Sequence, residues 1–188
     1  MVFASDVQFP DSLSDGNLVK QCQHGDRQSF RHLYRRHQKK VRSLLYQLCG
    51  ESALDDLVQE VFLRAWKGLP HLRQSATFAT WLYRITWNVA SDRRRELALA
   101  RDRQEVLTVE PASADRALMH LHYQDLVQKG LQMLSLSHRA VLVLHDLEDV
   151  PQKDIARILE VPVGTVKSRL FHARQTMRQF LQEEGVQL

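Results

Sequence analysis

The chain has 188 residues, of which 44% are hydrophobic and 26% charged, and its formal net charge is +4 with a pI of about 9.3. This length and composition indicate a globular protein with room for one domain or two small ones. No long apolar run and no signal peptide are found, which argues against a membrane-inserted or exported chain, so we expect a cytoplasmic protein.

The two cysteines, Cys22 and Cys49, are isolated in the sequence. Their spacing fits neither a zinc site nor a disulfide framework, which is typical of a reducing compartment. Cys22 and His24 make at most half of a metal site, and the other histidines show no ligand pattern. We therefore expect neither a metal nor a cofactor.

Signals for β-strands are almost absent, whereas helical periodicities are long, so the sequence predicts an all-α fold. The charges are segregated along the chain. No Asp or Glu occurs in residues 27–50 or 61–91, whereas acids collect in residues 51–60 and 146–154. This distribution favours anionic partners on some faces and a cationic partner on another.

Residues 30–50 are predicted to form the first long helix of the chain. Its apolar side comprises Leu33, Val41, Leu44, Leu45 and Leu48, and its basic cluster comprises Arg35, Arg36, Lys39, Lys40 and Arg42. The basic cluster fits an ordinary solvated face at least as well as a binding surface.

Residues 55–66, DDLVQEVFLRAW, predict a second helix with the core stripe Leu57, Val58, Val61, Phe62 and Ala65. Asp55, Asp56, Gln59 and Glu60 project together from it. Acids in a first helical turn are favoured by the helix dipole, so stability alone explains Asp55 and Asp56. The carboxylates lack an apolar cage or a partner nucleophile, so we expect no catalytic residue here. A docking surface for a basic protein is the better functional interpretation.

Residues 77–95 predict a third helix that buries Phe78, Trp81, Leu82, Ile85 and Val89. The opposite side combines an aromatic residue with cations and amides: Arg84, Trp87, Asn88, Ser91, Arg94 and Arg95. Such a surface suits single-stranded DNA, because unstacked bases stack on aromatic rings while cations follow the backbone. The polar loop before this helix, residues 71–77, is suited to receive an unstacked base.

Residues 97–112 are polar and lack aromatics, and we expect them to link two small helical domains. Ser113 is expected to cap a helix that contains Leu118, Leu121, Leu126 and Leu134. Ser137 is expected to cap the next helix, which buries Val141, Leu142 and Leu144. Residues 149–151 then turn the chain.

The last segment predicts a helix-turn-helix. A short helix, QKDIARILE, buries Ile155, Ala156 and Leu159, and Pro162 and Gly164 are placed in the turn. Residues 161–178 then form a helix with the stripe Val166, Leu170, Ala173 and Met177. Its other side carries cations and no acid, which is typical of a helix that reads the major groove of duplex DNA. A solvated basic face is the plainer alternative.

Taken in order, DDLVQEVFLRAW, FATWLYRITWN and IARILEVPVGTVKSRLFHAR resemble bacterial extracytoplasmic-function (ECF) sigma factors of the sigma-70 family. The resemblance implies an N-terminal tail at 1–16, a region 2 domain at 17–96, a linker at 97–118 and a region 4 domain at 119–184. It implies a non-enzymatic protein that binds core RNA polymerase and directs promoter recognition. An anti-sigma factor is the family's usual regulator.

The resemblance also implies roles for individual residues. Asp55, Asp56, Gln59 and Glu60 match the helix that docks on the clamp coiled coil of the largest polymerase subunit. The minus-ten element is expected to contact His71, Arg73, Ser75, Thr77, Arg84, Trp87, Asn88, Arg94 and Arg95. The minus-thirty-five duplex is expected to contact Thr165, Lys167, Ser168, Arg169, Phe171, His172, Arg174 and Arg178. His172 stands where the family commonly has Arg, which would weaken a phosphate or guanine contact at neutral pH.

Two other functions are compatible with parts of the sequence. An autonomous helix-turn-helix regulator would bind duplex operators without polymerase, but the acidic face at 55–60 would then have no role. A DNA-processing enzyme such as a recombinase would need a nucleophile or metal-binding carboxylates, which the sequence does not assemble.

Overall fold

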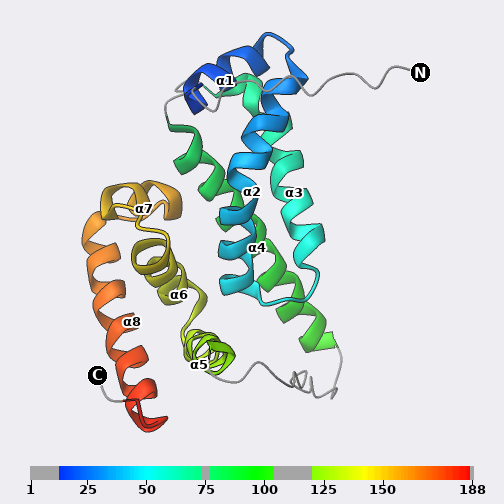
Figure 1. Cartoon of the computed structure of the whole chain (residues 1–188). Coiled ribbons are helices and arrows are strands. Elements are labelled where there is room, and N and C mark those ends of the chain that lie inside the picture. Colours follow the sequence, from blue (N-terminus) through cyan, green and yellow to red (C-terminus); the bar gives the residue numbers. More distant parts are fainter. Residues whose placement is uncertain (1–12, 73–76, 104–119, 187–188) are drawn as a thin grey trace.

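The computed structural model describes residues 13–72, 77–103 and 120–186, and for residues 100–103 and 120–124 it describes the backbone alone. Every regular element in these residues is helical, which confirms the all-α fold. Figure 1 shows two helical bundles, which we call the N-terminal half (residues 13–103) and the C-terminal half (residues 120–186). No helix in the described ranges is both long and apolar enough to cross a membrane.

The N-terminal half contains α1 (Asp15–Gln23), α2 (Arg27–Cys49), α3 (Leu54–Gly68), the short 3-10 turn η1 (Leu69–His71) and α4 (Phe78–Arg103). Helix α2 is central, since α1, α3 and α4 all pack against it. The predicted apolar stripes are confirmed: those of α2 and α3 are buried throughout. In α4, Phe78, Leu82 and Val89 are buried, while Trp81 and Ile85 are partly buried against the same core.

Polar contacts made by its first residue fasten α1 to α2. The Asp15 carboxylate lies 2.7 Å from Nε2 of His37 and accepts a hydrogen bond of 2.6 Å from Nη1 of Arg36. The His37 hydrogen bond is the main reason that the pKa of Asp15 lies below its usual value. Helix α1 therefore begins within the segment expected to be a tail, residues 1–16.

The C-terminal half contains α5 (His120–Met133), α6 (Leu136–Leu142), the short π-helical segment η3 (Val143–Leu147), α7 (Gln152–Leu159) and α8 (Val163–Glu183). Helix α8 packs against α5, α6 and α7. Its predicted stripe is confirmed, because Val166, Leu170 and Ala173 are buried and Met177 packs against the core. The two halves are in contact, since α7 packs along α4 while α6 and η3 contact α2.

Two local predictions are wrong. Ser135, not Ser137, caps α6, because the Ser135 hydroxyl accepts the backbone N–H of His138 and places Ser137 inside the first turn. Gly164 does not form the turn between α7 and α8. Glu160 does, at φ 55° in the left-handed region, after which Pro162 caps α8 and Gly164 lies within its first turn.

The expected linker is only partly within the described residues. Helix α4 continues past Leu97 to Arg103, so the first part of the expected linker is helical. Ser113 and Leu118, which were expected to begin the next helix, lie outside the described residues, and α5 is described from His120.

Ala53 offers a test of the backbone geometry at the start of α3. It lies at φ 58°, a left-handed conformation that costs a non-glycine residue about 1–2 kcal/mol. We expect Ala53→Gly to raise the free energy of unfolding by up to about 1 kcal/mol, after the greater flexibility of the unfolded chain is included. Ala65→Gly, in the buried interior of the same helix, should lower it by about 1 kcal/mol or more. Denaturant unfolding measures both, and equal losses in the two variants would contradict the assigned conformation.

Candidate protein-docking groove and nucleic-acid interfaces

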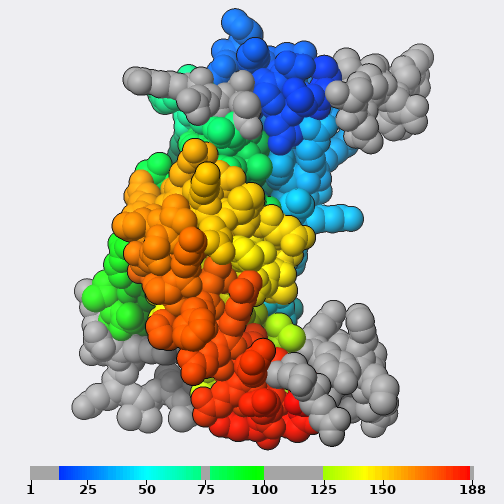
Figure 2. Space-filling model, turned by 90° about the vertical axis from the view of Figure 1, so that its left-hand side faces the viewer, coloured from blue at the N-terminus to red at the C-terminus, as the bar shows by residue number. Residues whose placement is uncertain are grey.

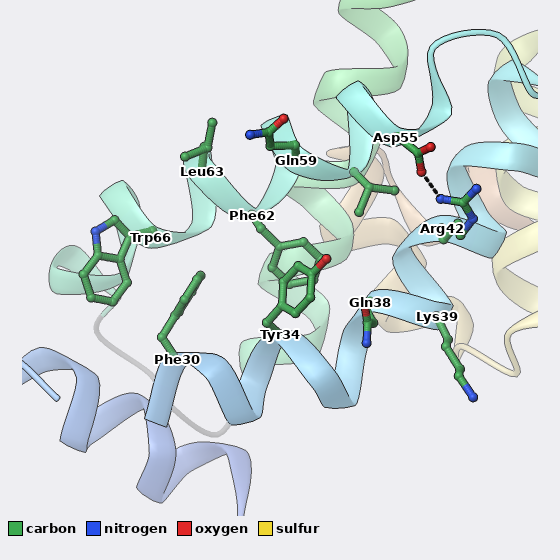
Figure 3. Close-up of a pocket in the computed structure, with 11 residues that line it drawn as sticks. Phe30, Tyr34, Gln38, Lys39, Arg42, Asp55, Gln59, Phe62, Leu63 and Trp66 are labelled. Atoms are coloured by element: carbon green, nitrogen blue, oxygen red, sulfur yellow. Dashed lines mark hydrogen bonds and ion pairs between the residues drawn. The ribbon is translucent and has the colours of Figure 1, made fainter. Parts of the chain in front are cut away.

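A groove of about 680 Å³ runs between α2 and α3 on the surface of the N-terminal half. Figure 3 shows its aromatic lining, in which Phe30 faces Trp66 and Tyr34 faces Phe62. The ring centroids are 4.8 Å and 4.6 Å apart in these two pairs, both with edge-to-face geometry. Trp66 and Leu63 remain 36% and 46% exposed, so the groove presents apolar side chains to solvent. Exposed apolar patches with a polar border mark protein interaction sites.

The structure brings two of the four predicted docking residues to this groove. Asp55 and Gln59 line it, and Asp55 forms an ion pair with Arg42 across the groove end, as Figure 3 shows. Both members of this pair are largely exposed, which leaves the Asp55 carboxylate available to another cation.

The other two predicted docking residues lie beside the groove. Asp56 is exposed on α3 but is not part of the groove lining. Glu60 pairs with Arg64 at 2.7 Å, and Arg64 also pairs with Asp92 of α4 at 2.9 Å. Glu60 therefore takes part in a network that ties α3 to α4.

No role was predicted from the sequence for Phe30, Tyr34 or Trp66, so the aromatic lining was missed. Phe62, predicted correctly for the core, also lines the groove. A signal was present in the sequence. Phe30 and Tyr34 are four residues apart, so they share one side of their helix. Leu63 and Trp66 likewise repeat at helical spacing outside the buried stripe of α3.

The residues expected to contact the minus-ten element lie along α4 and just before it. Arg84, Asn88, Arg94 and Arg95 are exposed, whereas Trp87 is partly buried and packs against the core. His71 is exposed at the end of η1, and Thr77 directly precedes α4. Arg73 and Ser75 lie outside the described residues, so the shape of the expected base-binding loop is not described.

All residues expected to contact the minus-thirty-five duplex lie on α8, where they form two groups. Lys167, Phe171, Arg174 and Arg178 recur every three to four residues, so they share one side of the helix. That side borders a second groove, of about 810 Å³, whose apolar lining includes Leu131, Leu142, Leu147 and Leu170. Thr165, Ser168, Arg169 and His172 lie on the neighbouring side and do not line it.

The two groups together span more than half of the helix circumference, at about 100° per residue. This arc is wider than a base-reading face requires. Phe171, which is 66% exposed, belongs to the groove side. The side that carries Lys167 and Phe171 is therefore suited to a protein contact as well as to DNA.

Arg174 already has an anionic partner in the structure. Its guanidinium donates hydrogen bonds of 2.9 Å and 2.6 Å to the two carboxylate oxygens of Asp146. This contact is the main reason that the pKa of Asp146 lies below its usual value. A DNA phosphate would have to replace Asp146, so Arg174 is held in place but not free.

Within the described ranges, no group of three or more His, Cys, Asp or Glu side chains is arranged to hold a metal ion. The thiols are not activated either: burial raises the pKa of Cys22 to about 11 and that of Cys49 above its usual value. The described surface instead offers apolar grooves and helices with exposed cations.

Comparison with protein families identifies the class to which this protein belongs. Residues 33–99 match the Sigma-70 region 2 family, and residues 124–177 match the Sigma-70, region 4 family. The first match covers most of the groove between α2 and α3, and the two matches together cover most of the candidate DNA-reading residues. The chain therefore has the two domains that define a sigma factor of RNA polymerase.

Curated relatives narrow the class. The ECF RNA polymerase sigma-E factor of Haemophilus influenzae is 30% identical, with 92% of this chain and 97% of that protein covered. The sigma-E factor of Escherichia coli and the RNA polymerase sigma-H factor of Pseudomonas aeruginosa are each 31% identical, with 89% of this chain and 94% of the relative covered. The chain belongs to the ECF sigma factors of the sigma-70 family, and it acts as an alternative sigma factor that directs transcription initiation.

Solved structures agree with this assignment. CnrH, solved in complex with the cytosolic domain of CnrY, matches with a TM-score of 0.68 and 26% identity, covering 90% of this chain and 97% of CnrH. The sigma factor RpoE of Bartonella quintana, solved with the anti-sigma factor NepR, shares the fold at a TM-score of 0.68, covering 81% of this chain and 96% of RpoE. Nothing in these matches favours an autonomous helix-turn-helix regulator.

His172 provides a test of the α8 assignment. We expect His172→Arg to tighten binding of the full chain to duplex DNA several-fold and to steepen its salt dependence by up to about 0.9 in the log–log slope, because one more phosphate is neutralised. Fluorescence anisotropy at several salt concentrations measures both quantities. His24→Arg adds the same charge at an exposed position on the other half of the chain. An equal effect of the two substitutions would show that His172 does not face the DNA.

Proposed function

We propose that the groove between α2 and α3 is the surface by which this sigma factor docks on core RNA polymerase. The observation that carries the proposal is the juxtaposition of exposed aromatic side chains with the Asp55 carboxylate and the Gln59 amide on one groove wall. The groove has an apolar floor, and its border carries Asp55 together with Lys39 and Arg42. Asp56 and Glu60 lie beside it on α3. These carboxylates next to an apolar floor suit a helical partner with apolar and basic side chains, such as the clamp coiled coil of the largest subunit.

We further propose that α4 and α8 divide promoter recognition between them. Helix α4 contacts the melted minus-ten strand through Arg84, Trp87 and Asn88, with Arg94 and Arg95 following the phosphates. Helix α8 enters the major groove of the minus-thirty-five duplex, with Lys167, Arg169, His172 and Arg174 as its positively charged or ionisable contacts.

Recognition of a melted strand requires energy that this chain alone does not supply. Extruding a base from a duplex costs a few kcal/mol. Docking on the polymerase core fixes the distance between α4 and α8, so that binding at both elements offsets this cost. Nucleotide addition is catalysed by the core, and this chain acts in the cytoplasm as a specificity subunit, not as an enzyme.

The regulator of this chain is proposed to be an anti-sigma factor. CnrH was solved in complex with the cytosolic domain of CnrY, and the Bartonella RpoE in complex with the anti-sigma factor NepR. In this chain, the apolar groove beside α8 is bordered by Lys167, Arg174 and Arg178. That combination suits an amphipathic helix with acidic residues at its edges.

The function is tested by transcription from a library of randomised promoter DNA with purified bacterial core polymerase, with and without this protein. We expect transcripts that require the protein and that enrich two separated sequence motifs. Tight binding to duplex operators without polymerase, together with no stimulation of transcription, would instead identify an autonomous regulator.

The docking groove is tested by charge reversal. We expect the double substitution Asp55→Arg with Gln59→Arg to weaken core binding at least about tenfold, because two cations then face a basic partner. Gln179→Arg with Glu183→Arg makes the same change at the same spacing on an exposed part of α8 and serves as the control. Competition for fluorescently labelled core polymerase measures the affinity, and circular dichroism checks the helix content. Unchanged core affinity in the Asp55 variant would remove this groove from the interface.

A further inference from the structure

The contact between the two halves places the C-terminal half over part of the proposed DNA-reading side of α4. Helix α7 packs along α4. Figure 2 shows the surface of α6–α8, coloured yellow to orange, in front of the green and cyan helices of the N-terminal half. Arg84 of α4 forms an ion pair with Glu160, at the end of α7. A residue proposed for DNA binding is therefore engaged by the other half of the same chain.

Tyr83, the neighbour of Arg84, is also held by the C-terminal half. Tyr83 is buried, and its hydroxyl donates a hydrogen bond of 3.4 Å to the carboxylate of Glu148, just after η3. Burial is the main reason that the pKa values of both Tyr83 and Glu148 are raised. Trp87 lies one helical turn beyond Tyr83 and Arg84, so it belongs to the same side of α4. A melted strand would have to displace Glu160 from Arg84, and it could not reach the buried Tyr83 while Glu148 remains in place.

A buried polar contact between the halves is made by Arg139 of α6. Its side chain is only 3% exposed, and its Nη1 donates a hydrogen bond of 3.0 Å to the backbone carbonyl of Leu48. Leu48 is in the last turn of α2, where carbonyls lack partners within the helix. Nη2 donates to the carbonyl of Leu134 at 3.3 Å. Gln128 adds a hydrogen bond of 3.3 Å to the carbonyl of Tyr46, in the same last turn.

Arg139 is unusual because no ion pair with a carboxylate is recorded for it among the described residues, although it is buried. Its Nε has no hydrogen-bond partner in that set, and burial lowers the pKa of the guanidinium. The negative end of the α2 dipole and the Leu48 carbonyl compensate the buried charge. If the halves separate, water replaces both contacts. A buried cation held by a helix end is therefore suited to a contact that can be released.

We propose that Arg139 is a latch that holds the free protein closed, with the C-terminal half covering the side of α4 that carries Tyr83, Arg84 and Trp87. The occlusion of DNA rests on the function proposed for α4, whereas the latch itself does not. Polymerase docking opens the latch, which uncovers α4 and frees α8 to reach a separate DNA element. The apparent affinity for DNA equals the affinity of the open form multiplied by the open fraction. A mostly closed free protein is therefore kept off promoters.

The latch is tested in the full chain by two substitutions on different elements. Arg139→Ala removes the contact with the end of α2. Glu148→Lys acts at a separate point, because its recorded partners Tyr83, Ser43 and Lys40 all belong to the N-terminal half, and the new cation faces Lys40. Arg157→Ala is the control, since it removes an exposed cation of α7 that pairs with Asp154 in the same helix.

Small-angle X-ray scattering measures the separation of the halves, and fluorescence anisotropy measures binding of a labelled single-stranded DNA of mixed sequence. We expect the unsubstituted chain and Arg157→Ala to be compact. Arg139→Ala and Glu148→Lys should have a larger radius of gyration, and DNA binding should tighten on the order of tenfold if about nine molecules in ten were closed. Circular dichroism checks that the helices persist. If Arg139→Ala loses helix content, Glu148→Lys decides the question.

Two results would overturn the latch: an extended unsubstituted chain, or folded variants that stay as compact as the control. An expanded variant with unchanged DNA binding would overturn the occlusion of α4. Because scattering involves neither polymerase nor promoter, a failure of the latch is distinguished from a failure of the proposed function, which the promoter library tests separately.

Discussion

Helix α4 packs against both halves of the chain at once, and the arrangement of the whole chain depends on this constraint. One side buries Phe78, Leu82 and Val89 in the core of the N-terminal half. An adjoining side, with Tyr83 and Arg84, meets the C-terminal half. A polymerase subunit that reads melted DNA with α4 must expose that adjoining side, so the same surface serves the closed chain and the proposed open complex in turn.

The chemistry of the contact between the halves is consistent with exchange between two states. Obligate interfaces are more apolar than transient ones. Here the recorded contacts include a buried guanidinium on a helix end, a tyrosine hydroxyl on a carboxylate, and an exposed ion pair. Each of these groups is well solvated by water when separated, so exposing them on opening is less unfavourable than exposing the same area of apolar surface. A single cation at the centre then has a large influence on the balance between closed and open.

Sequence periodicity was sufficient to predict the fold of each half but not their association. The stripes of α2, α3 and α8 were predicted correctly because a buried helix face repeats every three to four residues. Tyr83 and Arg139 carry polar groups, so no hydrophobic pattern marks them as buried, and their partners lie 65 and 91 residues away in the chain. The α6 cap was misplaced because Ser135 and Ser137 are equally good caps by residue type. The aromatic groove was missed because Phe30 and Trp66 become neighbours only when α2 and α3 pack.

Acids that are clustered along the sequence form ion pairs within the chain in the structure. Acids in residues 146–154 were expected to attract a cationic partner, yet several serve as counterions within the chain: Asp146 pairs with Arg174, and Asp154 with Arg157. Glu160 does the same for Arg84. Some of the residues proposed to contact DNA, Arg84 and Arg174 among them, thus carry carboxylate partners that occupy the place of phosphates. Binding DNA becomes an exchange of one anion for another, which reduces the net gain at each cation and leaves discrimination to the base contacts. In the proposed function, weak binding by charge alone keeps the sigma factor available to the polymerase, and promoter choice is made where α4 and α8 are both engaged.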